Sequence, residues 1–158
     1  LSELGTSLSM SKNTAERYLD LLEKAFVLQR LTGFSRNLRN EITKNCRYYF
    51  LDNGVRNALI NNFNLFHQRN DCGELWENYL VMERLKKQEY QDIQANNYFW
   101  RTYTKQEIDF VEDREGRLFG YEMKWGKAKP KIPKLWQSAY PDSSFELINR
   151  QNYLNFIT

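Results

Sequence analysis

The chain contains few of the residues that mark several large classes of protein. Its 158 residues include two cysteines, three prolines, seven glycines and one histidine. Because Cys46 and Cys72 stand far apart, they form neither a paired metal motif nor a disulfide framework, and a reduced, cytoplasmic setting is expected. No apolar run approaches the ~20 residues that a membrane-spanning helix needs. Nothing in the sequence has the basic-then-apolar pattern of a secretion leader.

Charged and aromatic side chains are plentiful instead. Charged residues make up 27% of the chain and aromatic residues 15%, and the formal net charge is +3. The charge is uneven, since residues 1–70 and 126–158 are basic and residues 71–125 are acidic. An acidic centre between basic ends suits a metal site with a nucleic acid laid across it, although charge also fluctuates along any soluble chain. The chain starts at Leu1, inside an expected helix, so we expect a fragment of a longer protein.

An asparagine-rich stretch at residues 61–71 interrupts the hydrophobic periodicity and predicts a boundary between two units. We therefore expect a first domain over residues 1–62, a linker over residues 63–72 and a second domain over residues 73–158. The two units carry different patterns of apolar residues, so each of them predicts its own fold and its own role in the protein.

The first unit has the pattern of a winged helix-turn-helix. Ser11 is a good N-cap, and apolar residues at helical spacing predict that one face of the following helix is buried. Those residues are Ala15, Tyr18, Leu19, Leu22, Ala25 and Phe26. Two strands follow, at residues 27–31 and 47–51, and the polar, basic connection between them has the place of a wing.

Two uses of this first unit stay open. In one, Lys12, Asn13 and Arg17 face the major groove of DNA. The wing residues Arg36 and Arg39 then contact backbone phosphates. In the other, the unit packs against a neighbouring module or subunit, a use that the acidic residues on the same helix favour because they dilute its positive charge. A transcription regulator built on the winged helix is a weaker third hypothesis, because it leaves the second unit unexplained.

The second unit predicts the order helix, three strands, helix, strand. Apolar spacing predicts the first helix, aromatic and β-branched runs predict strands, and a polar turn at residues 113–116 joins two of the strands. The elements are a helix over 73–85, strands over 97–101, 107–111 and 121–125, a helix over 133–140 and a strand over 145–148. This αβββαβ order places acidic residues on two adjacent central strands.

The hairpin formed by the second and third of these strands carries the candidate catalytic site. Because side chains alternate along a strand, Glu107 and Asp109 share a face, and so do Glu122 and Lys124. If the strands pair, the carboxylates gather beside an ammonium group, which is costly unless a cation is bound. Mg²⁺ takes one or two carboxylates and leaves other positions to water and phosphate, and a neighbouring lysine can orient the attacking water.

These motifs together resemble the PD-(D/E)xK nuclease superfamily. The closest resemblance within it is to an uncharacterised C-terminal domain family that follows an AAA+ ATPase module and a winged helix in many prokaryotic proteins. The stretches that carry it are Tyr48-Tyr49-Phe50-Leu51-Asp52-Asn53-Gly54, Gly73-Glu74-Leu75-Trp76-Glu77-Asn78, Tyr98-Phe99-Trp100-Arg101, Glu107-Ile108-Asp109-Phe110-Val111 and Glu122-Met123-Lys124. The resemblance implies a restriction-endonuclease-like fold for the second unit.

The resemblance also implies roles for four residues. Asp109 and Glu122 would be ligands of Mg²⁺ or Mn²⁺. Lys124 would position the nucleophilic water or contact the scissile phosphate, and Glu77 would be an accessory carboxylate. The proline that often precedes the first acid is replaced here by Ile108. The family pattern further implies an ATPase module upstream, but the chain has no Gly-x-x-x-x-Gly-Lys-Ser/Thr stretch, so we do not expect it to bind ATP.

Two functions of different classes follow from the sequence. The first is a metal-dependent deoxyribonuclease that forms the C-terminal region of a DNA-acting ATPase. The second is a non-catalytic module that binds DNA or protein, regulates the ATPase and keeps the carboxylates for structure. The choice between DNA and RNA and the formation of homo-oligomers stay open. For the aromatic residues near these motifs the plainer expectation is a place in the core; they are Trp76, Tyr79, Trp100 and Trp125.

Overall fold

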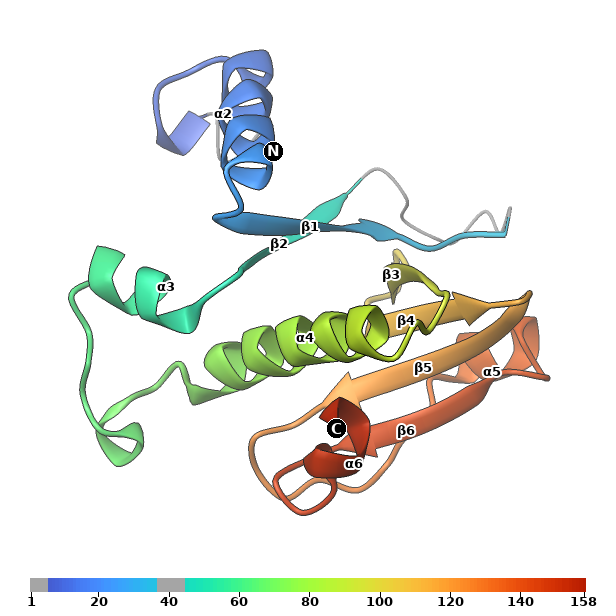
Figure 1. The fold of residues 1–158 in the computed structure, drawn as a ribbon. Coiled ribbons are helices and arrows are strands. Elements are labelled where there is room, and N and C mark those ends of the chain that lie inside the picture. Colours follow the sequence, from blue (N-terminus) through green and yellow to red (C-terminus); the bar gives the residue numbers. More distant parts are fainter. Residues whose placement is uncertain (1–5, 37–44) are drawn as a thin grey trace.

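The structure is a computed structural model that describes residues 6–36 and 45–158, and its fold is mixed α/β, built on one sheet (Figure 1). The sheet has six strands in the order β2-β1-β3-β4-β5-β6. Its neighbouring strands are antiparallel, except that β1 pairs with β3 and β5 pairs with β6 in parallel. No helix in the described part of the chain is long and apolar enough to cross a membrane.

The elements of the second unit follow the predicted order. The labelled elements of both units are, in chain order, α2 (Lys12–Lys24), β1 (Leu28–Gly33), β2 (Cys46–Phe50), α3 (Asn53–Leu59), the 3₁₀ turn η1 (Phe66–Gln68), α4 (Cys72–Tyr90), β3 (Asn96–Arg101), β4 (Glu107–Arg114), β5 (Arg117–Met123), α5 (Lys134–Ala139), β6 (Ser144–Ile148) and α6 (Tyr153–Ile157). The αβββαβ prediction corresponds to α4, β3, β4, β5, α5 and β6. The short α6 follows β6 and was not predicted.

The helix α2 begins where the sequence predicts, but its apolar face is not buried. Ser11 Oγ accepts a hydrogen bond from the backbone N–H of Thr14 at 3.1 Å and caps the helix. Only Ala15 in the helix is buried, whereas Tyr18 is 58% exposed and Phe26, two residues past the end, is 79% exposed. The prediction of a buried face was wrong because α2 packs mainly on the edge hairpin and the described residues place no second layer over it.

The β1–β2 hairpin joins the same sheet as the strands of the second unit. Thr32 and Gly33 on β1 lie opposite Tyr98 and Phe99 on β3, and the backbone N–H of Phe34 donates to the Phe99 carbonyl at 2.7 Å. The strands that we assigned to a separate wing therefore extend the central sheet. The predicted linker lies in the connection between α3 and α4, yet the sheet runs across the two units that it separates.

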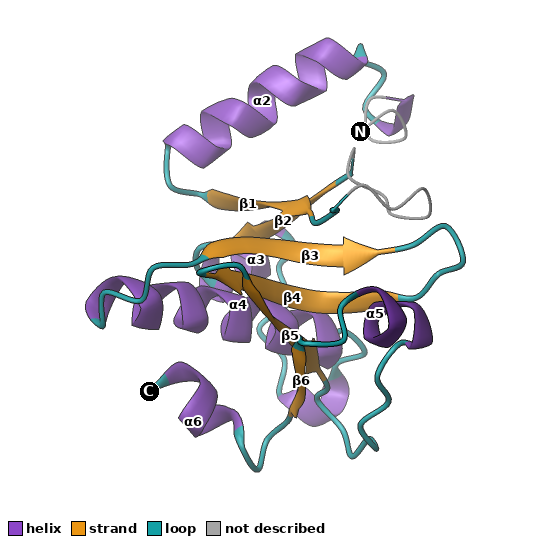
Figure 2. Cartoon of the chain, turned by 90° about the vertical axis from the view of Figure 1, so that its right-hand side faces the viewer, coloured by secondary structure: helices purple, strands orange, loops and turns teal. Residues whose placement is uncertain are grey.

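Two apolar cores lie on opposite sides of the sheet, as Figure 2 shows for α4 and α5. On the α4 side, Leu80 packs in a cluster with Phe110 and Tyr121. On the α5 side, Trp136 packs in a cluster with Trp100 and Ile108. Because every strand residue faces one side or the other, these clusters show which way each neighbouring polar side chain points.

Candidate functional site

A β-bulge in β4 sets the position of Asp109. Tyr98 lies opposite Val111 and Trp100 lies opposite Ile108, so β4 has one more residue than β3 across this interval. The extra residue leaves Asp109 and Phe110 together opposite a single residue of β3. A bulge of this kind bends the strand and redirects a side chain. Asp109 therefore departs from the simple alternation on which the sequence prediction relied.

The carboxylate of Asp109 occupies the space between β4 and β5. Regular pairing of these strands runs from the turn to Phe110 opposite Tyr121. Beyond that pair, Asp109 Oδ2 accepts a hydrogen bond from the backbone N–H of Met123 at 2.9 Å. Asp109 is only 4% exposed. Its side chain thus replaces a backbone acceptor at the point where the two strands separate.

Arg47 on β2 brings three carboxylates together. Its Nη1 atom lies 3.1 Å from Glu77 Oε1 and 3.2 Å from Asp109 Oδ1. Its Nη2 atom lies 3.2 Å from Glu107 Oε2, and the guanidinium stands 4.9 Å from the centre of the Phe99 ring. Burial alone would lower the pKa of Arg47, but Tyr49, Glu77 and Asp109 raise it above its ordinary value. Arg47 is therefore a fixed cation at the centre of the cluster.

Glu77 reaches this cluster from α4. Its Oε1 atom accepts a second hydrogen bond from the hydroxyl of Tyr49, at 2.7 Å. Burial and the negative charge of Asp109 raise the pKa of Glu77 above its ordinary value, and Arg47 and Tyr49 offset part of that rise. Burial and the neighbouring Glu77 likewise raise the pKa of Tyr49. The accessory carboxylate predicted from the sequence therefore does lie beside Asp109, with Arg47 between them.

Glu122 and Lys124 form a pair at the end of β5. The Lys124 Nζ atom lies 2.5 Å from Glu122 Oε1. Tyr121 and Met123 pack into the α4-side core, so strand alternation directs Glu122 and Lys124 toward the other side, as predicted. Burial and then the charge of Asp109 raise the pKa of Glu122. The two predicted metal ligands therefore influence each other electrostatically, although the bulge gives them different nearest partners.

The cluster contains more negative than positive charge. Arg47 contacts three carboxylates, and Lys124 contacts a fourth, which belongs to Glu122. The carboxylates are Glu77, Glu107, Asp109 and Glu122. Arg101, whose Nε atom is 3.8 Å from Glu107 Oε2, adds a more distant and exposed charge. An added cation would be stabilised at such a centre.

The donor set suits a magnesium or manganese ion held by few protein ligands. Among the described residues, no group of three or more histidine, cysteine, aspartate or glutamate side chains is arranged to hold a metal. Magnesium, however, is commonly held by one or two carboxylates, with water and phosphate completing the shell. Asp109 and Glu122 supply that chemistry, but Arg47 and Lys124 each contact one of their oxygen atoms. An ion bound there would compete with these cations for those oxygens.

Sequence reasoning missed Arg47. The sequence did contain a signal for it. Side chains alternate along β2, so Arg47 and Tyr49, two residues apart, lie on the same face of the strand. Tyr49 is buried in the α4-side core, so its neighbour two positions earlier also points toward α4. What the sequence did not supply was the pairing of β1 with β3, which joins this hairpin to the sheet next to the neighbour of β4.

The residues predicted to contact nucleic acid do not form one group. Lys12, Asn13 and Arg17 are exposed on α2, and Lys12 Nζ lies 3.6 Å from Glu16 Oε1. Their positions are compatible with binding and leave the prediction untested. Arg39 lies outside the described residues.

Arg36 has partners within the chain. Its Nη2 atom donates to the carbonyl of Gly116 at 2.9 Å and lies 3.4 Å from Asp113 Oδ2, so it docks on the β4–β5 turn. Its guanidinium also stands 5.8 Å from the Phe34 ring centre. A phosphate contact by Arg36 would therefore compete with these interactions.

The aromatic residues expected in the core are mostly there. Trp76 is buried in the α4-side core and Trp100 in the α5-side core, while Trp125 is partly buried against the α4 side. Tyr79 is 37% exposed. Its exposure has a structural reason, since its side of α4 lines a pocket rather than the sheet.

Comparisons with known proteins identify relatives of both units. Residues 72–154 match the family described as "Domain of unknown function (DUF4143)", and residues 1–65 match the family described as "Domain of unknown function (DUF8612)". The chain is similar to an uncharacterised protein of Mycobacterium tuberculosis and to one of Mycobacterium bovis, each 32% identical over 145 residues. These alignments cover 89% of this chain and 31% of each relative, so the chain spans about a third of the relatives' length. No solved structure matches it.

The two matched regions leave residues 66–71 between them, inside the predicted linker. DUF4143 domains are usually the C-terminal domains of AAA-like ATPase proteins. The match to that family covers more than half of the 158 residues and includes α4 with every strand from β3 to β6. The chain therefore belongs to the DUF4143 family.

Proposed function

We propose that the chain is the nuclease-like C-terminal region of an ATPase-family protein, with a divalent-cation site at Asp109 and Glu122 that serves phosphodiester hydrolysis. The carrying observation is that Asp109, at the bulge, accepts a hydrogen bond from the backbone N–H of Met123, the residue that lies between the paired Glu122 and Lys124. The raised pKa of Glu122, caused by burial and by Asp109, supports a centre that favours an additional positive charge.

Each residue of the site has a distinct task in this proposal. Asp109 and Glu122 would hold the cation, and a cation bound there lowers the pKa of water and offsets negative charge on phosphate. Lys124 would orient the attacking water or contact the phosphate once its pairing with Glu122 is loosened. Glu77 would act as an accessory acceptor for that water from the α4 side.

The nucleic-acid part of the proposal depends on the first unit. The winged-helix arrangement would place Lys12, Asn13 and Arg17 against a duplex. Arg36 and Arg39 would add phosphate contacts. Support comes from the exposure of the three α2 residues and from the shared sheet, which fixes the β1–β2 hairpin beside the proposed site. Nucleic acid bound to the first unit would then lie close to the carboxylate cluster.

The test is a cleavage assay with Mn²⁺ or Mg²⁺ on double-stranded and single-stranded DNA and on RNA. Asp109→Asn and Glu122→Gln should each abolish cleavage while circular dichroism shows an intact fold. Glu89→Gln, on the exposed side of α4, is the matched control and should cleave like the unaltered chain. Equal cleavage by all variants would show that the activity comes from another site or a contaminant.

A second candidate function is a non-catalytic platform that binds nucleic acid or protein and regulates the ATPase. It is favoured by one observation, namely that Arg47 already pairs with Glu77, Glu107 and Asp109. An arginine in that place satisfies the carboxylates without a metal. Calorimetric titration with Mn²⁺ separates the candidates, since the platform predicts no binding that depends on Asp109 and Glu122.

A further inference from the structure

A run of lysines follows β5, in a segment over residues 124–134 that we call the lysine segment. Its lysines are Lys124, Lys127, Lys129, Lys131 and Lys134, and residues 123–141 contain no aspartate or glutamate. All five lysines are exposed. In the described part of the chain, no ion pair joins the last four to a carboxylate. Their positive charges therefore face solvent without a counter-charge from the described residues.

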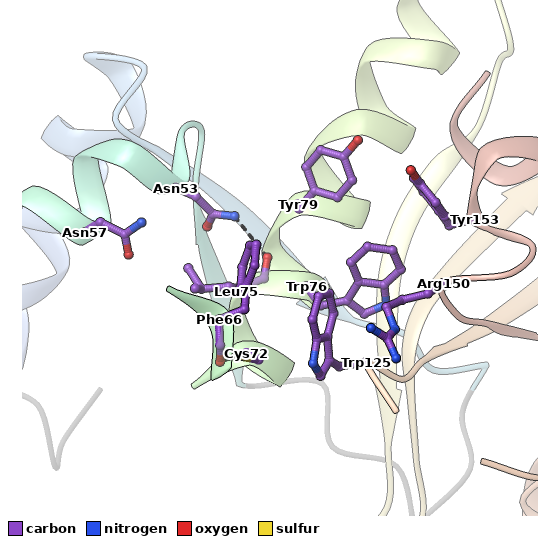
Figure 3. A pocket seen from close by; sticks show the side chains of 10 residues that line it. All are labelled: Asn53, Asn57, Phe66, Cys72, Leu75, Trp76, Tyr79, Trp125, Arg150 and Tyr153. Carbon is purple, nitrogen blue, oxygen red and sulfur yellow. Dashed lines mark hydrogen bonds between the residues drawn. The ribbon is translucent and has the colours of Figure 1, made fainter. Parts of the chain in front are cut away.

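The lysine segment is anchored to the fold at both ends. Near its start, the Trp125 ring centre lies 5.5 Å from that of Trp76, and the Arg150 guanidinium stands 4.8 Å from the Trp125 ring centre (Figure 3). Just past its other end, the backbone N–H of Leu135 donates to Gln106 Oε1 at 3.1 Å. The path of the segment is therefore set by contacts with α4, with the chain after β6 and with the start of β4.

Prolines shape the middle of the lysine segment. Pro130 and Pro133 fix their own φ angles and disfavour helix in the residues that precede them. Accordingly, no helix or strand is formed between β5 and α5. In an extended chain, residues two positions apart are separated by about 6–7 Å. Lys127, Lys129 and Lys131 therefore form a row of charges, which suits a row of phosphates better than a single small anion.

This row borders the candidate site. Because β4 and β5 are antiparallel, the start of β4 and the end of β5 lie at the same end of their hairpin. The lysine segment leaves β5 at Lys124, which pairs with Glu122. It returns to the hairpin at Gln106, which directly precedes Glu107. Both ends of the segment therefore lie at the end of the hairpin where the carboxylate cluster stands.

A pocket of about 290 Å³ lies where the lysine segment meets the start of β4. It is lined by Gln106, Lys131, Ile132, Pro133 and Lys134, and no carboxylate is in this lining. Gln106 Oε1 already accepts from Leu135, so the polar side-chain groups left to a ligand are the amide N–H groups of Gln106 and the two ammonium groups. Groups of these kinds are common donors to phosphate oxygens.

We infer that the lysine segment binds the phosphate backbone of a nucleic acid. One phosphate lies in the pocket formed by Gln106, Lys131 and Lys134, and further phosphates follow the row toward Lys129 and Lys127. Contacts of this kind depend on charge and carry no base sequence. The site is distinct from the α2 surface to which we assigned the duplex.

The choice of nucleic acid among polyanions rests on the proposed function. Hydrolysis at Asp109 and Glu122 needs the substrate backbone at this end of the hairpin, and the lysine segment holds it there. A nucleic acid bound in this way reaches the carboxylate cluster without any contact to α2. The segment thus supplies the substrate contact that the first unit alone leaves to the opposite edge of the sheet.

The test measures binding of labelled duplex DNA, single-stranded DNA and RNA by fluorescence anisotropy, in the presence of a metal chelator so that no cleavage is needed. Lys131→Gln with Lys134→Gln should raise the Kd by about tenfold or more at about 0.1 M salt, because two phosphate contacts are lost. The slope of log Kd against log salt concentration should fall by about one to two. Lys131→Arg with Lys134→Arg keeps both charges and should bind like the unaltered chain.

The matched control is Lys24→Gln with Lys86→Gln, which changes the net charge by the same amount. These lysines are exposed and already pair with Asp20 and Glu83, each at 2.7 Å. The control should leave the Kd and the salt slope nearly unchanged.

Gln106→Glu tests the pocket itself. It keeps the oxygen that accepts from Leu135 but replaces the amide donor with a negative charge, so it should also raise the Kd.

Three results would overturn the inference. They are no binding of any probe, equal weakening by the lysine pair and the control pair, and displacement of labelled DNA by polyglutamate as effectively as by unlabelled DNA. The last result would assign the segment to an acidic protein surface. Absence of cleavage with this binding intact counts against the proposed function only, whereas loss of this binding leaves the metal titration of Asp109 and Glu122 to decide that function separately.

Discussion

The Nη1 atom of Arg47 lies 3.2 Å from Asp109 Oδ1, so the buried carboxylate of β4 is held by an arginine of the β1–β2 hairpin. The two residues are 62 positions apart in sequence. Their contact ties the hairpin, which sequence patterns assigned to one unit, to the candidate site of the other. The same contact poses the main functional question, because it places Arg47 where it competes with a cation for Asp109.

Replacing Arg47 with alanine should destabilise the fold by about 1–3 kcal/mol near pH 7, because Glu77 and Asp109 lose a partly buried partner. The cost should shrink as the pH falls, since Arg47 lowers the pKa of Glu77 and its removal lets Glu77 accept a proton more readily. Urea denaturation at about pH 5 and pH 8 measures this difference. The double variant Arg47→Ala with Glu77→Gln should recover part of the loss at pH 8, and an equal cost at both pH values would contradict the role given to Arg47.

Asp71 predicts a second pH dependence, which lies at lower pH. Arg69 contacts both of its oxygens at 2.8 Å, and Arg56 Nη1 lies 2.7 Å from Oδ2. Hydrogen bonds from Arg69 and then Arg56 hold the pKa of Asp71 well below its ordinary value. The stability that this carboxylate contributes is therefore present above its unfolded pKa of about 4 and is lost as the pH falls through the lower folded pKa.

Asp71→Asn should accordingly destabilise the chain at pH 7, and the difference from the unaltered chain should diminish below about pH 4. Thermal denaturation across this range measures it. The exposed Asp142 supplies the control, since Asp142→Asn should change the melting temperature little at either end. A constant difference across the range would mean that the Asp71 effect is not due to its charge.

Glu112 is the most deeply buried acid of the sheet. It is 0% exposed, and Arg84 from α4 contacts both of its oxygens, at 2.5 and 3.0 Å. Glu112→Ala should cost about 3–5 kcal/mol, because it leaves the Arg84 guanidinium buried without its counter-charge. The double variant Glu112→Leu with Arg84→Met should be clearly more stable in urea than Glu112→Ala. A single variant no worse than the double one would show that the pair contributes little.

Asn78 joins α4 to the edge strand β2 by imitating a strand partner. Its Oδ1 accepts from the Phe50 N–H and its Nδ2 donates to the Phe50 carbonyl, both at 2.8 Å. Asn78→Ala should lower the free energy of unfolding by about 1–3 kcal/mol, since both backbone groups lose their partner. Hydrogen exchange should show faster exchange of the Phe50 amide than of the Leu51 amide, which donates to the Val27 carbonyl and does not involve Asn78. Unchanged exchange at Phe50 would mean that water replaces the side chain at no cost.

The local elements were the part of the structure most accessible to prediction. The Ser11 cap, the two strands of the first hairpin and the αβββαβ order depend on neighbouring residues, so spacing and turn chemistry indicated them. The burial of α2 was predicted wrongly, because an apolar face shows what a helix can pack against and not whether a partner is present.

The candidate site likewise has features that the sequence predicted and features that it did not. Glu122 and Lys124 sit two residues apart on one strand, so their pairing follows from alternation alone. Asp109 was identified as a site residue, but its orientation was not, because a bulge depends on how β3 and β4 are registered. The contacts of Arg47 with Glu77 and Asp109 are visible only when distant segments are brought together.

Local patterns along the chain were enough to predict most of its helices and strands and the acidic side chains at the end of the central hairpin. These properties follow from hydrophobic period, capping and strand alternation, all of which act over a few residues. Three features became visible only in the folded chain: β1 lies beside β3, Asp109 sits in a bulge, and Arg47 stands between Asp109 and Glu77. Those outcomes depend on the register of strands far apart in the chain and on charges that are stabilised only by each other once they are buried.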